Sequence, residues 1–199
     1  MAKKAPAERI LHLAREQGVL RLRDATALGI HPEYVRRMAT DGRLIRSGRG
    51  LYMLPEADVT EHHALVEAAR RVPEAIVCLL SALQFHKIGT QMPHQIWLAI
   101  DVKARLPRVD HPPLRIVRFS GDALRTGIEV RRIEGTQVRV YGPAKTVADC
   151  FKYRNKIGLD VALEALRDCW KKRRATMDEL WQAAKICRVA NVMFSSFVY

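Results

Sequence analysis

Residues 31–54 read HPEYVRRMATDGRLIRSGRGLYML, and this stretch decides the fold of the first part of the chain. It contains five arginines and only two acidic residues. Pro32 suits the first turn of a helix, because the missing proline N–H needs no partner there. Further on, two apolar segments flank Ser47-Gly48-Arg49-Gly50, a pattern that predicts a β-hairpin. The stretch therefore predicts a basic helix followed by a basic hairpin.

The predicted helix has one apolar face and one polar face. At 100° per residue, the face formed by Val35, Met38 and Ala39 is suited to burial. The opposite face carries the polar side chains, with Tyr34 on the flank: Glu33, Arg36, Arg37 and Thr40. Asp41-Gly42 ends the helix.

Two more helices are predicted before this one, over Ala7–Gln17 and Asp24–Leu28, each followed by a glycine. Three helices and a hairpin within about 50 residues predict a winged helix-turn-helix, a DNA-binding fold. Pro55-Glu56 interrupts the pattern and marks a domain boundary. We therefore expect a winged-helix domain over residues 1–55 and a second domain over residues 56–199.

Such a fold inserts its third helix into the major groove and places its wing beside it. A guanidinium group can bond guanine O6 and N7 together, so Arg36 and Arg37 are suited to guanine edges or to phosphates. Arg46 and Arg49 on the wing are suited to phosphates or to the minor groove. The full set of predicted DNA contacts is His31, Glu33, Tyr34, Arg36, Arg37, Arg43, Arg46, Arg49, Arg21 and Arg23. The alternative is that these arginines form an ordinary solvated surface.

The overall charge favours a polyanionic partner. The chain carries a formal net charge of +13 and has a pI near 10.1. Residues 1–55 contain 11 lysines and arginines against 5 acidic residues, whereas the remaining residues contain 23 against 16. Because the first quarter is more basic per residue, nucleic acid is the expected partner there, ahead of an anionic membrane surface.

The same sequence argues for a cytoplasmic protein. The apolar runs Ala75–Leu80 and Ile96–Ile100 are far shorter than the ~20 residues that cross a bilayer. The first residues lead into an amphipathic helix, with no apolar segment of a secretory signal. The four cysteines are too widely spaced for a local metal site and are expected to be reduced and buried: Cys78, Cys150, Cys169 and Cys187.

The second part predicts an α+β domain with a small sheet and C-terminal helices, because its strands and helices do not alternate strictly. The expected strands are Gln95–Ile100, Leu114–Phe119, Gly127–Ile133 and Gln137–Tyr141. The expected helices are Glu61–Arg71, Leu79–Lys87, Pro143–Asn155, one capped by Asp160 up to Lys172, and one up to Arg188. Thr176 and Glu179 form a predicted capping box for this last helix.

An enzyme would need a cluster of catalytic side chains. Asp101-Val102-Lys103 has the spacing of half a metal-dependent nuclease site, but no acidic residue lies between Glu74 and Asp101 to share a metal. A strand-end turn is the expected alternative. His62 and His63 are expected on a helix surface, and His86 near Gly89. Lys145 and Asp149 are expected to form a modest helix salt bridge. No metal site, cofactor or enzymatic activity is therefore expected.

The run Lys171-Lys172-Arg173-Arg174 has two interpretations. Cations at a helix C-terminus are favoured by the helix dipole, which is reason enough for their presence. The functional interpretation is a second basic patch for nucleic acid or for an acidic partner.

The order of several motifs resembles the AbiEi-type antitoxins of bacterial abortive-infection toxin–antitoxin systems. In the first part the motifs are Gly29-Ile30-x-x-x-Tyr34-Val35-x-x-Met38 and Arg49-Gly50-Leu51-Tyr52. In the second part they are residues 81–90, Pro93 with Ile96–Ile100, residues 141–151 and residues 156–166. The resemblance covers nearly the whole chain. It departs from the family at Phe194–Tyr199, where the tail is shorter than expected or altered.

The resemblance implies an antitoxin of a type IV system that also represses its own operon. Its partners would then be double-stranded promoter DNA and a nucleotidyltransferase-like toxin, counteracted with or without direct contact. Two alternatives remain open from the residues. One is a stand-alone transcriptional regulator with an effector-binding C-terminal domain, and the other is a metal-dependent nuclease.

Overall fold

The computed structural model describes residues 5–195. Within this range the chain divides into two compact units. Unit 1 contains the residues up to Pro73 together with Arg132–Val138, and unit 2 contains Glu74–Arg131 and the residues from Arg139 onward. Helices and strands occur in both units, so the predicted mixture of helices and sheets is confirmed. None of the helices described is long and apolar enough to cross a membrane.

Unit 1 contains four helices and a small sheet among the described residues. The helices are α1 (Pro6–Gln17), α2 (Leu22–Ala27), α3 (Pro32–Thr40) and α4 (His63–Arg71). The strands are β1 (Leu20–Arg21), β2 (Ile45–Gly48) and β3 (Leu51–Met53), which pair antiparallel in the order β1-β3-β2. The predicted three helices and hairpin therefore form, in an arrangement that is consistent with a winged helix-turn-helix.

The core of unit 1 explains the positions of these elements. α1 and α3 contribute fully or almost fully buried side chains, among them Ile10, Val35 and Met38. β3 adds Tyr52, which pairs opposite Leu20 of β1 and Arg46 of β2. α3 thus has one face in the core, as the 100° spacing predicts.

Unit 2 contains the longer strands and most of the helices. The strands are β4 (Ile76–Val77), β5 (Ile96–Asp101), β6 (Leu114–Phe119), β7 (Ile128–Ile133) and β8 (Thr136–Tyr141). They lie in the order β6-β5-β4-β8-β7, with β5 parallel to β6, β4 parallel to β8 and β4 antiparallel to β5. Residues 132–138, where β7 turns into β8, group with unit 1.

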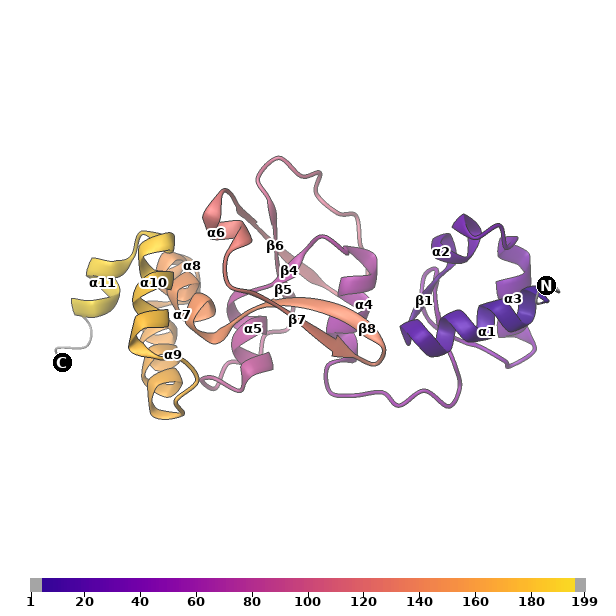
Figure 1. The fold of residues 1–199 in the computed structure, drawn as a ribbon, viewed down its shortest axis with the longest axis horizontal. Coiled ribbons are helices and arrows are strands. Elements are labelled where there is room, and N and C mark those ends of the chain that lie inside the picture. The colour runs from indigo at the N-terminus through magenta and orange to yellow at the C-terminus, as the bar shows by residue number, and fades with distance from the viewer. Residues whose placement is uncertain (1–4, 196–199) are drawn as a thin grey trace. The chain divides into compact units, whose positions relative to one another are not determined.

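The helices of unit 2 are α5 (Leu79–His86), α6 (Asp122–Arg125), α7 (Pro143–Lys152), α8 (Arg154–Ile157), α9 (Leu159–Lys171), α10 (Met177–Cys187) and α11 (Ala190–Ser195). α7 is the central one, since it packs against α5, α9 and α10. Figure 1 shows α7 to α11 gathered as one helical group.

Several predicted boundaries were wrong. The strands β1 and β4 and the helix α6 were not predicted, because segments of two to four residues carry no recognisable period. α7 ends at Lys152 and α8 follows separately, and Gly158, not Asp160, is the residue before α9. The predicted capping box of Thr176 and Glu179 is confirmed. At the tail, α11 extends to Ser195, and residues 196–199 lie outside the described residues.

The predicted salt bridge between Lys145 and Asp149 is confirmed, but it is buried and so differs from the modest helix pair that the spacing predicts. Both side chains are at most 3% exposed, and Lys145 Nζ lies 2.6 Å from both carboxylate oxygens of Asp149. Lys145 Nζ also lies 4.2 Å from the ring centre of Tyr141, and Cys187 Sγ donates to Asp149 at 3.2 Å. Burial raises the pKa of Asp149 to about 6, although the charge of Lys145 opposes the shift. The pair is buried because α7 is covered on several sides, which the i,i+4 spacing alone does not reveal.

The four cysteines are free thiols and all are buried, as predicted. Burial raises the pKa of Cys169 to about 11 and that of Cys187 to about 12. His86 lies in the same unit, where its Nε2 is 2.8 Å from the carbonyl oxygen of Tyr141. Gly89 N donates instead to Asp168, at 2.8 Å.

Candidate nucleic-acid interface

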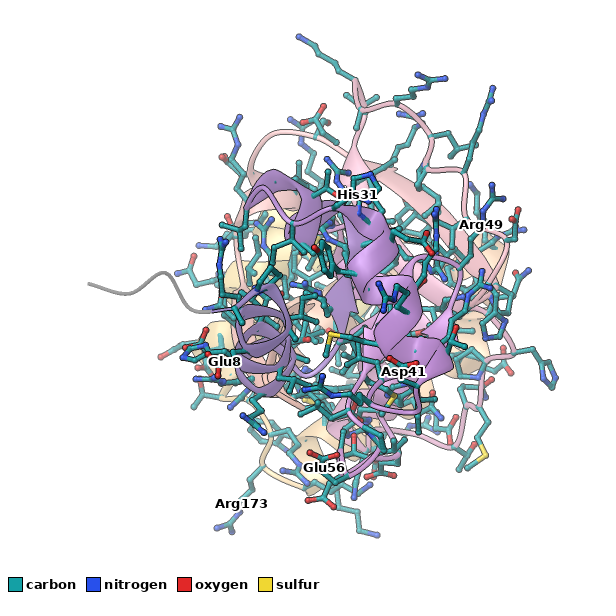
Figure 2. All side chains as sticks on the ribbon, turned by 90° about the vertical axis from the view of Figure 1, so that its right-hand side faces the viewer. Glu8, His31, Asp41, Arg49, Glu56 and Arg173 are labelled. Atoms are coloured by element: carbon teal, nitrogen blue, oxygen red, sulfur yellow. The ribbon has the colours of Figure 1, made fainter. Side chains whose placement is uncertain are left out.

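α3 presents a polar, basic face at the surface of unit 1. Figure 2 looks onto this helix, with His31 and Asp41 at its two ends and Arg49 to one side. Val35 and Met38 are 0% and 4% exposed, whereas the side chains around the rest of the helix are exposed: Glu33, Tyr34, Arg36, Arg37 and Thr40. The structure therefore brings the predicted base-contacting residues of this helix onto one accessible face.

The start of α3 is fixed by its own side chains. His31 is the N-cap residue, and its Nδ1 accepts a hydrogen bond from Glu33 N at 3.2 Å. In a neutral ring the proton is then on Nε2, which can donate to an acceptor outside the helix. Glu33 also forms an ion pair with Arg36 at 3.2 Å, and both side chains are more than half exposed. An ion pair with this exposure contributes little, at most about 1 kcal/mol, so Arg36 can exchange Glu33 for another anion.

The hairpin after α3 carries the remaining predicted contacts. Ile45 pairs opposite Met53 and Arg46 opposite Tyr52, and a bulge between Arg46 and Gly48 bends the strand. The tip is Arg49-Gly50, and Gly50 has a positive φ of 71°. The arginines of this segment are exposed: Arg43, Arg46 and Arg49. The hairpin thus presents cations along its length, as a wing would.

The hairpin is held by α4, which lies within the predicted second domain, residues 56–199. Arg71 Nη1 donates to the carbonyl oxygen of Arg49 at 3.1 Å. Ser47 Oγ donates to Glu67, a residue that is only 4% exposed, and lies 3.4 Å from His63 Nε2. These contacts restrain both the tip and the first strand, β2, of the hairpin. The sequence gives no signal for them, because the partners are about 20 residues apart.

His63 was predicted to be an ordinary helix-surface residue, and this was wrong. Its side chain is 23% exposed, and Nδ1 lies 2.7 Å from Glu134 Oε2. Thr60 donates to the other oxygen of Glu134 from its backbone N and its hydroxyl, at 2.7 and 2.8 Å. Burial raises the pKa of Glu134, but these hydrogen bonds outweigh burial, so the pKa lies below its usual value. His62 is the N-cap residue of α4 and lies 3.7 Å from Glu61.

Arg21 and Arg23, the predicted backbone contacts, differ in their surroundings. Arg23 is exposed on α2. Arg21 forms a 2.7 Å ion pair with Asp24 and donates to the carbonyl oxygen of Arg70 at 2.8 Å. Arg70 also lies 2.6 Å from Asp24, so this carboxylate is shared by two guanidinium groups. Arg21 is therefore engaged within unit 1, and its contact with DNA stays a prediction that would require Asp24 to release it.

The four residues of the predicted second basic patch, Lys171 to Arg174, have two different surroundings. Lys172 Nζ lies 2.7 Å from Asp168 and donates to the carbonyl oxygen of Lys87, also at 2.7 Å. The other three side chains line a cavity beside the turn between α9 and α10: Lys171, Arg173 and Arg174. Lys172 thus has the structural role expected of a cation at a helix end. Lys171, Arg173 and Arg174 lie at the cavity instead.

The Asp101-Val102-Lys103 segment forms the strand-end turn that was the expected alternative to a nuclease site. Asp101 Oδ1 accepts a hydrogen bond from Lys103 N at 2.8 Å, at the end of β5. Across residues 5–195, no group of three or more histidines, cysteines or carboxylates is placed to hold a metal ion.

Comparison with known proteins agrees with the resemblance over the first part of the chain, at residues 8–55. Residues 8–55 match the family model of the AbiEi antitoxin, a transcriptional regulator. Comparison with curated proteins gives no match. Among solved structures, the crystal structure of the RV2827C protein from Mycobacterium tuberculosis is similar, with a TM-score of 0.56 and 17% sequence identity. The match covers 96% of this chain and 79% of that one, and at this identity it shows a shared fold alone.

The matched residues contain most of α1, all of α2 and α3, and the hairpin, and so include the elements that present the basic face. Residues 8–55 therefore match the AbiEi family of antitoxin transcriptional regulators.

Proposed function

We propose that this protein is a cytoplasmic bacterial antitoxin that represses its own operon, with α3 as the recognition helix and the β2–β3 hairpin as the wing. The observation that carries the proposal is the placement of Arg36 and Arg37. Both are exposed opposite the buried Val35 and Met38, within the segment that matches the antitoxin family. A recognition helix needs one face in the core and hydrogen-bonding side chains on the other.

Each group in the interface has a proposed role. Arg36 and Arg37 contact base edges in the major groove, with His31, Glu33 and Tyr34 beside them at the start of the helix. Arg46 and Arg49 contact phosphates or the minor groove, and Arg43 and Arg23 contact the backbone. The fixed hairpin favours this use, because α4 restrains the wing before DNA arrives and so reduces the entropy lost on binding.

Antitoxicity is the second part of the proposal. We assign residues 1–55 to promoter binding and residues 56–199 to counteracting a nucleotidyltransferase-like toxin, as in a type IV system. No cofactor or catalytic step is required for either task.

Titration of the protein with its own upstream DNA tests promoter binding. Replacing Arg36 or Arg37 by alanine should weaken binding by about 1–3 kcal/mol and relax the preference for that sequence, because a base contact is lost. The matched control is the Arg105→Ala/Arg108→Ala variant, which removes two exposed arginines from unit 2. Unchanged affinity in the Arg36→Ala/Arg37→Ala variant would remove α3 as the recognition helix.

A further inference from the structure

A cavity in unit 2 combines cations with an exposed indole. It has a volume of about 630 Å³ and lies beside the turn between α9 and α10. The residues that line it are Trp170, Lys171, Arg173, Arg174, Ala175, Thr176, Met177 and Glu179. Its size is within the ~300–1,000 Å³ range typical of sites that enclose a drug-sized or nucleotide-sized group.

The cavity is strongly positive. Lys171, Arg173 and Arg174 are all exposed, and none forms an ion pair with a carboxylate of residues 5–195. Figure 2 shows Arg173 extending away from the ribbon. The single acidic residue among the lining residues, Glu179, accepts hydrogen bonds from Thr176 N and Oγ1 at 2.7 and 3.0 Å. This carboxylate is held in the helix cap, and the three cations of the lining outnumber its single negative charge.

Aromatic and apolar surface continues from the cavity along α10. Trp170 is 47% exposed at the cavity, and Met177 is 38% exposed on its other side. Trp181, one helical turn after Met177, is 42% exposed, and Lys185 follows one turn later with Nζ 5.8 Å from the indole. Phe194 packs edge-on against Trp181 at 4.8 Å between ring centres and so fixes its orientation.

Three cations and an exposed indole are more than the end of α9 requires for its own stability. One cation at a helix C-terminus satisfies the dipole, and Lys172 already lies there with Asp168. Large aromatic side chains are usually buried, so two half-exposed indoles beside unpaired cations are suited to a ligand with flat apolar rings and negative charge. Nucleic acid has both, and its bases are available for stacking when it is single-stranded.

We infer that the α9–α10 cavity binds single-stranded nucleic acid, with a base stacked on Trp170 and the backbone phosphates on Lys171, Arg173 and Arg174. Trp181 and Lys185 continue the track for the next nucleotides. Duplex DNA is disfavoured, because its bases are stacked on one another and cannot reach an indole. The inference does not depend on the winged helix, because every residue that carries it belongs to unit 2.

Fluorescence anisotropy with the full chain tests the inference. The probes are fluorescein-labelled dT15, a U15 oligonucleotide and a 15-base-pair duplex, and the Arg36→Ala/Arg37→Ala background reduces duplex binding by α3. Trp170→Ala should weaken binding of dT15 or U15 at least about fivefold, and Trp170→Phe should keep most of it, because phenylalanine still stacks. Arg173→Ala/Arg174→Ala should weaken binding about tenfold or more at low salt and flatten its salt dependence.

The controls distinguish binding at this cavity from nonspecific binding to a basic protein and from the proposed binding of promoter DNA by α3. Arg105→Ala/Arg108→Ala removes the same charge elsewhere in unit 2 and should leave oligonucleotide binding within twofold. Intrinsic tryptophan fluorescence should fall on oligonucleotide addition in the parent protein and change much less in Trp170→Phe. If α3 does not bind DNA, the background substitutions change nothing and these comparisons remain valid.

Three results would overturn the inference. The first is unchanged oligonucleotide affinity in Trp170→Ala and Arg173→Ala/Arg174→Ala, with circular dichroism showing that both variants are folded. The second is equal loss in the Arg105→Ala/Arg108→Ala control. The third is displacement of dT15 by polyglutamate as efficient as by unlabelled dT15, because the site would then recognise an acidic chain by charge alone.

Discussion

The Lys145–Asp149 pair illustrates how burial changes the meaning of a residue spacing. Exposed, an i,i+4 ion pair on a helix contributes a few tenths of a kcal/mol. When the pair is buried, each charge has lost its hydration and is stabilised by its partner instead. Removing one partner therefore leaves a buried charge that neither water nor an opposite charge stabilises. Tyr141 and Cys187 complete the surroundings of the pair.

We expect Lys145→Met to lower the free energy of unfolding by about 3–5 kcal/mol, because it leaves the Asp149 carboxylate buried and without its cation. Urea denaturation at pH 7 measures the loss. The double variant Lys145→Met/Asp149→Leu removes both charges and should recover more than half of it. A single variant within 1 kcal/mol of the parent would mean that water reaches the carboxylate.

Residues whose surroundings are local could be predicted from the sequence, and residues with distant partners could not. The buried face of α3 follows from helix geometry, and Val35 and Met38 lie there as predicted. Arg21 was expected at the surface, but it binds the carbonyl oxygen of Arg70, 49 positions away. Composition and period contain no information about such a pairing.

The elements of unit 1 are marked by proline, glycine and helical period. Pro32 opens α3, and Gly18 and Gly29 follow α1 and α2. β4 lacks such marks, because it has two residues within an apolar run and its register depends on β5 and β8. Sequence therefore predicts the longer elements, whereas the short strands are defined by tertiary pairing.

Gly18 provides a test of how tightly α1 ends. It has a φ of 67°, and a Cβ there would lie 1.5 Å from the carbonyl oxygen of Glu134. Gly29 has a similar φ of 74°, but a Cβ there would meet nothing within 4 Å. We expect Gly29→Ala to lower stability by about 1–2 kcal/mol from backbone strain alone. Gly18→Ala should lower it further, because the backbone at Glu134 must move.

Thermal unfolding of the two alanine variants, compared with the parent, measures this difference. Equal melting temperatures for the two variants would contradict it. In that case backbone strain alone would account for both losses.

At the scale of the whole molecule, the proposed division of labour predicts separable functions. The Arg36→Ala/Arg37→Ala variant should derepress a reporter fused to the protein's own promoter several-fold. If a nucleotidyltransferase-like toxin is encoded beside it, the variant should still protect cells that express this toxin, because the proposal assigns the toxin-directed surface to residues 56–199. Growth after toxin induction and reporter activity are measured in the same strain.

Loss of both functions together would contradict this division. Absence of a neighbouring toxin gene would favour a stand-alone regulator. A variant at unit 2, such as Arg105→Ala/Arg108→Ala, controls for expression level in both assays.

Unit 1 is assembled from two separate parts of the chain, and this affects how it is made. Residues 132–138 supply the acceptor for Thr60 and His63, and Thr136 donates to the carbonyl oxygen of Gln17 at 2.6 Å. During translation at about 5–20 residues per second, residue 132 is added roughly 3–12 seconds after Pro73. Unit 1 therefore cannot complete its hydrogen bonds on the ribosome until residues 132–138 have been added to the chain.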